Sequence, residues 1–403
     1  MASKGLEETV VTKHPRRDEV LIVSWASGGN LPPLLAAGKL LAAHDHPVCV
    51  LASAATRDPV LQAGFEVIGY KRARDPNMEL AFEEQAAQMM ATAAGEEVAL
   101  DVRDVIAARR PELMIVDCML PAGIAAGEST GTPTVSLVHF PYGLARAQMQ
   151  RGAGAWTTDR ARLNLTRRVL GLKPVTGDLA AWESNELLLV TVPRWFDLAA
   201  NFPANVVHAG PLGVSRAPDE RSTPDGRPLV LLSFSTTVMQ GQTALVQRVC
   251  DAIAGQDVDA IVTLGPAVSA EAIHVPHNVE TKSYADHDQL LPRCAAVVTH
   301  GGLGTTLRTL CHGTPLLLLP LGRDQQFNAT RVVELGAGIH LACDAPTARI
   351  WQAVERLTSE AGFREAATAS AARIAADNPD RAALQAVEAA AGRQSHGNRR
   401  QGR

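Results

Sequence analysis

The chain has 403 residues, of which 46% are hydrophobic and 20% are charged, and its formal net charge at pH 7 is -4. This composition is typical of a folded protein, and it carries no basic excess that would attract nucleic acid or an anionic membrane surface. The length predicts two domains of roughly 200 residues each, with a cleft between them. We therefore expect small-molecule partners, no nucleic acid, and a monomer or homodimer.

The cysteines and the apolar runs indicate where the protein works. The six cysteines show no CxxC spacing, and several lie in apolar runs, so we expect reduced core residues and neither a disulfide framework nor a metal site. The charged first residues do not resemble a signal peptide. The run "PLLLLPL" is far shorter than the roughly 20 residues of a membrane-spanning helix. These features predict a cytoplasmic protein without stable membrane insertion.

Apolar strand-like runs alternate with Ala-rich amphipathic segments along most of the chain. After a polar tail at residues 1–18, this pattern fills residues 19–209, and it returns at residues 229–391, before a second tail at 392–403. Pro, Gly and charged residues interrupt it at 210–228, which we expect to be an interdomain linker. Strands that are apolar on both faces and separated by helices predict parallel sheets. The fold class is therefore α/β, with two doubly wound, Rossmann-like domains.

Two segments of the first domain carry polar residues where predicted strands end. The strand "EVLIVSW" leads into Gly28-Gly29-Asn30 and then into a helix, and Asp117 ends the strand "ELMIVD". In doubly wound folds, ligands bind beyond the carboxyl ends of the strands. A single Gly-rich turn is a weak signal, so this turn is open to interpretation as a phosphate cradle, a catalytic turn or a tight corner.

The most informative passage runs from residue 290 to residue 341. A strand ends at Thr299 and is followed by "HGGLGTT", a helix, the strand "GTPLLLLP" and the pair "DQ". A glycine-rich turn that enters a helix offers free N–H groups and the positive end of the helix dipole to a phosphate. Thr305 and Thr306 would add hydroxyl donors to this cradle, and Asp324 and Gln325 follow the next strand, where they could bind the hydroxyl groups of a sugar.

This passage resembles the donor-binding motif of family 1, UDP-glycosyltransferase-like enzymes with the GT-B fold. The resemblance implies a donor site formed by Ser235, Thr236, His300, Gly301, Gly302, Gly304, Thr305, Thr306, Asp324 and Gln325. In that site His300 contacts and neutralises the diphosphate, residues 302–306 cradle it, and Asp324 and Gln325 hold the sugar. It implies no cofactor and no metal, only a UDP- or TDP-sugar as co-substrate. Plant members carry a glutamate for the ribose hydroxyls where this chain has Arg308, so we expect ribose recognition to differ.

The same resemblance assigns acceptor binding and the general base to the first domain. The usual base is a histidine in the first turn, and Asn30 occupies that position in this chain. An amide cannot accept a proton near neutral pH. Asp117 matches the carboxylate that orients the base, and either Asp117 or His139 could take the proton instead. The acceptor pocket is expected to include Phe82, Met89, Met90 and Phe140, although such residues also serve as ordinary core.

The expected function is inverting transfer of a sugar to a small, aromatic or polyketide-like acceptor, with Asn30 in place of the histidine base. Two alternatives stay open. One is a non-catalytic auxiliary homologue of a partner transferase, and the other is a different GT-B enzyme such as a UDP-N-acetylhexosamine transferase.

Overall fold

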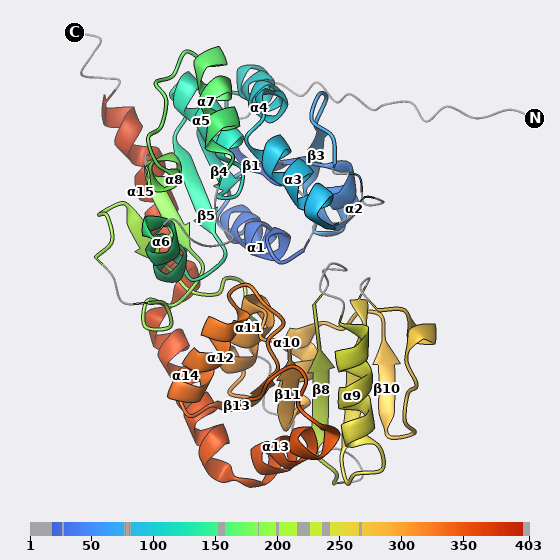
Figure 1. Cartoon of the computed structure of the whole chain (residues 1–403). Helices are drawn as coiled ribbons and strands as arrows, with labels where there is room; N and C mark the ends of the chain where they lie inside the picture. The colour runs from blue at the N-terminus through green and yellow to red at the C-terminus, as the bar shows by residue number, and fades with distance from the viewer. Residues whose placement is uncertain are drawn as a thin grey trace, which may run out of the picture.

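The structure is a computed structural model of the whole chain, and it describes residues 18–25, 28–75, 77, 80, 82–151, 158–183, 185–198, 201–215, 226–235, 242–265 and 268–397. The described residues form two parallel sheets, one in each half of the chain (Figure 1). This arrangement confirms the predicted α/β class with two doubly wound sheets.

The first sheet has seven strands in the order β3-β2-β1-β4-β5-β6-β7. Its central strands are buried along their whole length, as parallel strands covered by helices on both faces must be. The strands are β1 Val20–Val23, β2 Val48–Ala52, β3 Glu66–Gly69, β4 Leu113–Asp117, β5 Thr134–Val138, β6 Leu187–Val190 and β7 Val206–His208.

Helices cover both faces of this sheet (Figure 1). They are α1 Leu31–Ala42, α2 Ala54–Gln62, α3 Phe82–Ala93, α4 Glu96–Arg109, α5 Pro121–Thr130, α6 Tyr142–Gln150, α7 Arg160–Val169 and α8 Asp178–Glu183.

The second sheet has six strands in the order β10-β9-β8-β11-β12-β13. Its strands are β8 Leu229–Ser233, β9 Asp259–Thr263, β10 Val279–Lys282, β11 Ala296–Thr299, β12 Leu316–Leu318 and β13 Gly338–His340. Its helices are α9 Thr243–Ile253, α10 His287–Leu290, α11 Leu303–Cys311, α12 Gln325–Glu334, α13 Thr347–Ser359 and α14 Ala361–Asp377, with short 3-10 turns at Ala270–Ala272 and Leu291–Arg293.

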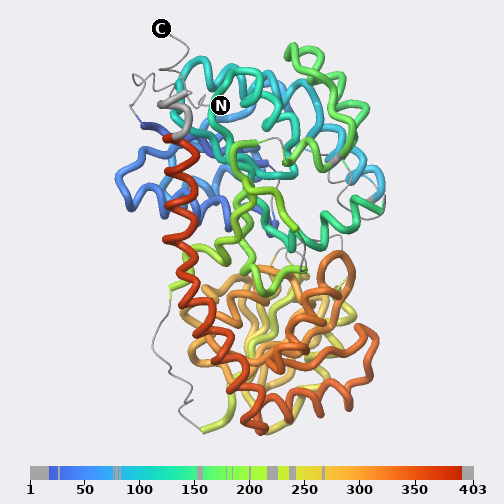
Figure 2. The backbone as a smooth tube through the Cα atoms, turned by 90° about the vertical axis from the view of Figure 1, so that its left-hand side faces the viewer, coloured from blue at the N-terminus to red at the C-terminus, as the bar shows by residue number. Residues whose placement is uncertain are grey.

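The last helix, α15 (Pro379–Gly397), departs from the predicted domain assignment. The sequence pattern placed residues 379–391 in the second domain, but Ala383, Val387 and Ala390 are buried in the core of the first sheet. Figure 2 shows α14 and α15 running along one side of both halves. An Ala-rich amphipathic helix has an apolar face but no signal that names the sheet it packs against, which explains the difference. The extent of the linker at 210–228 stays a prediction, because residues 216–225 lie outside the described residues.

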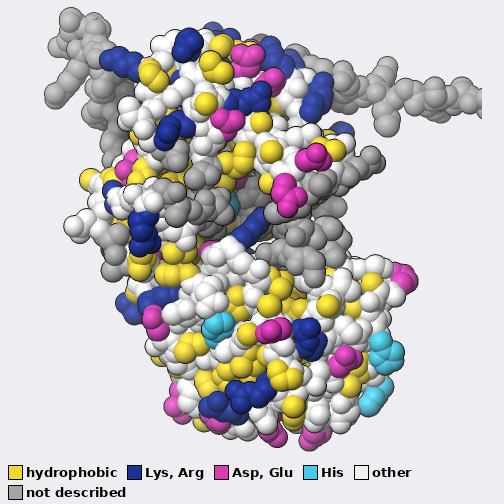
Figure 3. All heavy atoms as spheres, viewed as in Figure 1, with side chains coloured by type: hydrophobic (Ala, Val, Ile, Leu, Met, Phe, Trp, Pro, Cys, Tyr) yellow, Lys and Arg dark blue, Asp and Glu magenta, His cyan; other side chains and the backbone are white. Residues whose placement is uncertain are grey.

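The carboxyl ends of both sets of strands point toward the junction between the two halves (Figure 1). In space-filling representation, the face drawn in Figure 3 is hollowed at this junction. All six cysteines are free, and five of them are buried, as expected for reduced core residues. Among the described helices, none combines the length and the apolar character needed to cross a membrane.

Candidate functional site at the facing sheet edges

Three polar side chains meet at the carboxyl edge of the first sheet. Asp117 is the last residue of β4, His139 directly follows β5, and Asn30 precedes α1 after β1. Since β4 lies between β1 and β5, the three strand ends are neighbours. Asn30 Nδ2 lies 2.7 Å from Asp117 Oδ2, and His139 Nε2 lies 3.2 Å from Asp117 Oδ1. The structure therefore joins all three residues that the sequence analysis named as catalytic candidates.

Asp117 is the centre of this group and is fully buried. Burial by itself would raise the pKa of its carboxyl group, but His139 and the hydrogen bonds from Asn30 and the Met119 N–H outweigh burial and hold that pKa below its usual value. Asp117 is thus a buried anion at neutral pH. A carboxylate only accepts hydrogen bonds, so His139 donates through Nε2–H and keeps Nδ1 as its proton-accepting nitrogen.

Asn30 supports Asp117 and has no proton-accepting role of its own. Its Nδ2 group donates one hydrogen bond to the Asp117 carboxylate and another, of 2.8 Å, to the Trp25 carbonyl oxygen. The amide therefore ties the turn after β1 to the end of β4. This contact answers the question that the Gly28-Gly29-Asn30 turn raised, because the turn presents a donor to a buried anion.

The same group includes a cysteine. Asp117, Cys118 and His139 each bring one possible metal-ligating atom to within 4.8 Å of the others. Among the described residues, this is the one group of three such side chains. Burial and the neighbouring Asp117 raise the pKa of the Cys118 thiol well above its usual value. The Asp117 oxygens of this set already accept hydrogen bonds from Asn30, His139 and the Met119 N–H.

The carboxyl edge of the second sheet carries the glycine-rich turn. His300 follows β11, Gly301 has a φ of +84°, and α11 begins at Leu303 with Gly302 as its N-cap. A Cβ atom on Gly302 would lie 2.7 Å from the His300 Nε2 atom, so glycine is required for the imidazole to fold against the turn. The free N–H groups of the first turn of α11 lie at this edge, as a phosphate cradle requires.

His300 differs electrostatically from the expectation. Its side chain is buried, and burial is the main cause that lowers its pKa to about 4. The imidazole is therefore neutral at pH 7, so it offers a hydrogen bond and no positive charge to a diphosphate. The burial of a residue at a strand end cannot be read directly from the sequence. For this reason we expected His300 to neutralise the diphosphate.

The remaining donor-side candidates divide into exposed and structural residues. Gly304 is exposed and Thr305 half-buried, whereas Thr306 is fully buried, so its hydroxyl group faces the interior. Ser235 is buried in a turn whose backbone exchanges hydrogen bonds with the Gln242 side chain, including a 2.7 Å bond from the Ser235 N–H. Thr236 lies outside the described residues.

Asp324 and Gln325 occupy different environments. Gln325 is buried, and its Oε1 accepts hydrogen bonds from the N–H groups of Leu321 and Gly322 at 2.7 and 3.2 Å, which closes the loop after β12. Asp324 is half-buried. Burial raises the pKa of its carboxyl group, while Asn328, Arg323 and His139 act in the opposite direction. Asp324 follows β12 at the carboxyl edge of the second sheet, and that edge points toward the carboxyl edge of the first sheet, where Asp117 and His139 lie (Figure 1).

Arg308, which stands where plant members carry a glutamate, forms an ion pair. Its Nη1 lies 2.5 Å from Asp288 Oδ2, and the His312 Nε2 atom lies 3.0 Å from Asp288 Oδ1. The backbone N–H of Ser215 also donates to Asp288 Oδ2 at 3.1 Å. Arg308 is thereby held by α10, a partner that no sequence motif indicated.

The four candidate acceptor residues lie in different environments. Phe140 is 2% exposed and packs on Trp182, with ring centroids 5.6 Å apart, so the core and not an acceptor surrounds it. The Phe140 ring also packs against the His139 ring at nearly a right angle, with ring centroids 5.2 Å apart, and so supports the imidazole. Met89 and Met90 are half-buried on α3, and Met89 packs against the core beside β1. The Phe82 side chain lies outside the described residues.

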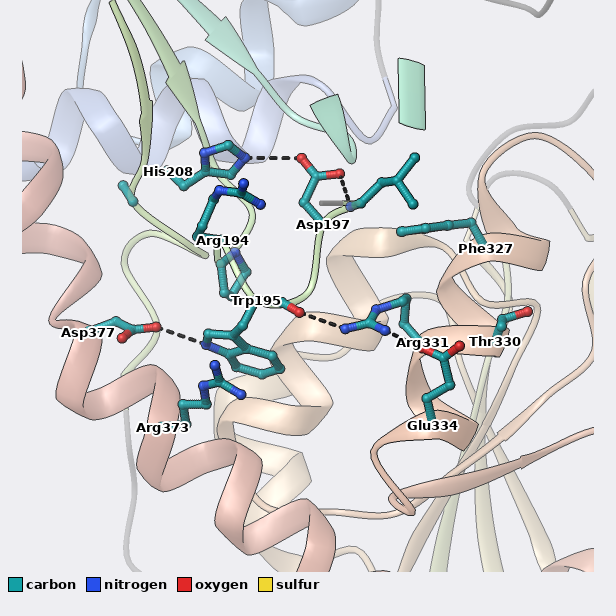
Figure 4. A pocket seen from close by; sticks show the side chains of 13 residues that line it. Arg194, Trp195, Asp197, His208, Phe327, Thr330, Arg331, Glu334, Arg373 and Asp377 are labelled. Carbon is teal, nitrogen blue, oxygen red and sulfur yellow. Dashed lines mark hydrogen bonds and ion pairs between the residues drawn. The ribbon is translucent and has the colours of Figure 1, made fainter. Parts of the chain in front are cut away.

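A cavity of about 920 Å³ lies away from this chemistry, between the segment after β6, α12 and α14 (Figure 4). Its walls connect the two halves. Arg331 donates to the carbonyl oxygens of Trp195 and Phe196 at 2.6 and 3.0 Å, and Trp195 Nε1 donates to Asp377 at 2.9 Å. These bonds fix α12, which begins beside Asp324, relative to the first sheet.

Comparisons with known proteins concern the family and the fold of the chain. The family described as "Erythromycin biosynthesis protein CIII-like, C-terminal domain" matches residues 247–389. The aklavinone 7-beta-L-rhodosaminyltransferase of Streptomyces galilaeus is 30% identical over 300 residues, which are 68% of this chain. The aligned chain spans 66% of that relative, just under two thirds.

Two solved structures share the fold over nearly the whole chain. The calicheamicin glycosyltransferase CalG4 is 24% identical with a TM-score of 0.75, and the alignment covers 94% of this chain and 99% of CalG4. The glycosyltransferase VinC, solved in complex with DTDP, is 22% identical with a TM-score of 0.72, and the alignment covers 93% of this chain and 100% of VinC. The fold is therefore GT-B, as the sequence predicted.

Proposed function

We propose that the chain is a bacterial natural-product glycosyltransferase of family 1, and that it transfers a sugar from a nucleoside-diphosphate sugar to a small acceptor, with inversion at the anomeric carbon. The observation that carries this proposal is the hydrogen-bonded Asn30–Asp117–His139 group at one sheet edge. This group lies at the carboxyl edge of the first sheet, and the turn after β11 and Asp324 lie at the carboxyl edge of the second sheet across the junction (Figure 1).

His139 is the general base of the proposed reaction. Asp117 fixes the imidazole through Nε2–H and stabilises the imidazolium that forms, while Asn30 holds Asp117 in place. The acceptor hydroxyl group transfers its proton to His139 Nδ1 as its oxygen forms a bond to the anomeric carbon. The bond between that carbon and the diphosphate oxygen breaks, and the nucleoside diphosphate leaves with the electron pair.

The second half of the chain binds the donor. The N-terminal N–H groups of α11 and the neutral His300 imidazole donate hydrogen bonds to the diphosphate and stabilise the charge that develops on it. The Asp324 carboxylate accepts hydrogen bonds from the sugar hydroxyl groups. The proposed reaction uses no metal ion or other cofactor.

We propose that the donor nucleotide is thymidine diphosphate. Arg308, which is paired with Asp288, stands where plant members carry the glutamate that binds the ribose hydroxyl groups, and a 2′-deoxyribose has one hydroxyl group fewer to satisfy. Solved structures of VinC with DTDP and of the spinosyn rhamnosyltransferase SpnG with thymidine diphosphate support this assignment. The names of the relatives, which include an aklavinone transferase and a demethylrebeccamycin synthase, support an aromatic natural-product acceptor.

Thermal unfolding with TDP, UDP, GDP and NAD tests the donor assignment. A ligand that binds only the folded state stabilises it by about 2.7 kcal/mol at 100 times its Kd. We expect the largest rise in Tm with TDP and none with NAD. The decisive companion assay is product formation from TDP-sugars and a panel of aromatic acceptors. Absence of a Tm shift with both TDP and UDP would contradict the proposal and favour a non-catalytic auxiliary homologue.

A further inference from the structure

Asn328 is a fully buried side chain on α12 that the proposed reaction does not use. Its Nδ2 group donates to the Gly301 carbonyl oxygen at 2.9 Å and to Asp324 Oδ2 at 3.1 Å. Both partners only accept hydrogen bonds, which fixes the orientation of the amide. One side chain therefore joins the glycine-rich turn after β11 to the carboxylate that precedes α12.

The two segments that Asn328 joins are already in contact. A Cβ atom on Gly301 would lie 3.3 Å from the Gln325 carbonyl oxygen and 3.6 Å from Gln325 Cβ. The residue at position 301 must therefore be small, and its φ of +84° favours glycine as well. Because the backbones approach this closely, the amide of Asn328 determines how the turn and the Asp324 carboxylate are oriented relative to each other.

The polar side chain at position 328 carries a cost in folding free energy. Asn328 Oδ1 is buried without a hydrogen-bond partner among the described residues. Buried polar atoms normally have partners, and local exceptions of this kind are concentrated at functional sites. Packing alone would be satisfied by an apolar residue of similar size, so the two hydrogen bonds of Nδ2 are what the asparagine contributes.

We propose that Asn328 is a positioning residue for the donor, which sets the separation between the diphosphate-binding turn and the hexose-binding carboxylate. This inference rests on the proposed function, because it takes the glycine-rich turn as the diphosphate site. The diphosphate and the hexose are covalently joined, so their two binding groups must keep one fixed geometry. The ligand class is a hexose that presents hydroxyl groups to a carboxylate next to its diphosphate.

The hydrogen bond from Asn328 also affects the ionisation of Asp324. Burial raises the pKa of the Asp324 carboxyl group, and the bond from Asn328 opposes this rise, as do Arg323 beside it and His139 across the junction. Without the bond, the pKa of Asp324 rises further. The ionised carboxylate is needed to accept hydrogen bonds from sugar hydroxyl groups, so sugar binding would be lost at a higher pH as the solution is acidified.

Calorimetric titration of TDP and of TDP-glucose tests the proposal. The measured quantity is the affinity gained from the sugar, taken as the ratio of the Kd of TDP to the Kd of TDP-glucose. Asn328→Ala is expected to reduce this ratio about tenfold, the effect of a lost hydrogen bond to a charged group, and to change the Kd of TDP much less. On acidification, the Asn328→Ala variant should begin to lose TDP-glucose binding at a higher pH than the wild type does.

A matched control is Asn278→Ala. Asn278 is also buried, and its Nδ2 group donates to the carbonyl oxygens of Ile253 and Val258 at 3.0 Å each, but it contacts neither turn. This variant should lose stability and keep the wild-type ratio. If Asn328→Ala does not fold, Asn328→Ser, which is too short to reach both acceptors, carries the same expectation.

Two results would overturn the positioning role. One is an unchanged ratio and acid profile in the Asn328 variant, and the other is a wild-type protein that binds TDP but gains no affinity from the sugar. A wild-type protein that does not bind TDP would instead refute the proposed function itself.

Discussion

Replacing Asp117 with asparagine keeps the size of the side chain and removes its charge. In the wild type, the buried carboxylate accepts hydrogen bonds from His139 at 3.2 Å, from Asn30 at 2.7 Å and from the Met119 N–H at 2.9 Å. The variant can still accept on one side, but its amide hydrogens meet a donor on the other. It therefore orients His139 poorly and offers no negative charge to the imidazolium.

The size of the expected effect follows from the charge separation. Two unit charges about 4 Å apart attract each other by about 4 kcal/mol at an effective dielectric constant of about 20. Each 1.36 kcal/mol corresponds to a tenfold change in rate. Loss of the full attraction in the transition state would thus lower kcat about 1,000-fold. Partial compensation by the remaining hydrogen bonds gives an expected loss of about 100-fold to 1,000-fold.

The assay is the initial rate of product formation at saturating donor and acceptor, with the Kd of TDP measured separately. The Kd of TDP should stay unchanged, because Asp117 lies in the half of the chain that does not hold the turn. Asp197→Asn is the matched control, since Asp197 is equally buried and lies 3.0 Å from His208 Nε2 outside the site. A kcat of Asp117→Asn no lower than that of the control would refute the reasoning.

Three further predictions concern neighbouring groups. Asn30→Ala should lower kcat about tenfold, because one hydrogen bond to the Asp117 carboxylate is lost; an unchanged kcat would exclude the supporting role. His300→Ala should lower kcat about 10-fold to 100-fold without unfolding the protein, as rates and thermal unfolding together would reveal, and wild-type turnover would remove His300 from the donor site. Acidification should destabilise the wild type more than Asp117→Asn: the folded-state pKa of Asp117 lies below the ordinary 3.8, so its stabilisation is complete above that pH and is lost as the pH falls further. Identical stability-versus-pH curves would contradict this.

The sequence predicted the parts of the site that depend on strand order and turn composition. Asp117 and His139 follow buried strands, and parallel strands bring their carboxyl ends to one edge, so their proximity follows from the alternating pattern. The glycine-rich turn before α11 was likewise visible in its residues. Strand-end chemistry is local, and this is why sequence reasoning reached it.

The parts that sequence reasoning missed depend on burial and on partners distant in the chain. Gln325 closes its own loop, and Phe140 supports His139 from the core, although both side chains suit ligand contacts equally well by type. Asn328 binds a carbonyl oxygen 27 residues away, and α15 packs on the first sheet. None of these choices is encoded by periodicity, since each depends on which surfaces become buried when the chain folds.

The central claim is that His139 accepts the acceptor proton in place of a histidine in the first turn. The most direct measurement is kcat for the wild type and for His139→Ala, with and without added imidazole. A general base contributes about 100-fold to 10,000-fold, so the variant should lose that much rate. Added imidazole should restore part of the rate in the variant and leave the wild type unaffected. Wild-type turnover by His139→Ala would contradict the assignment of the base.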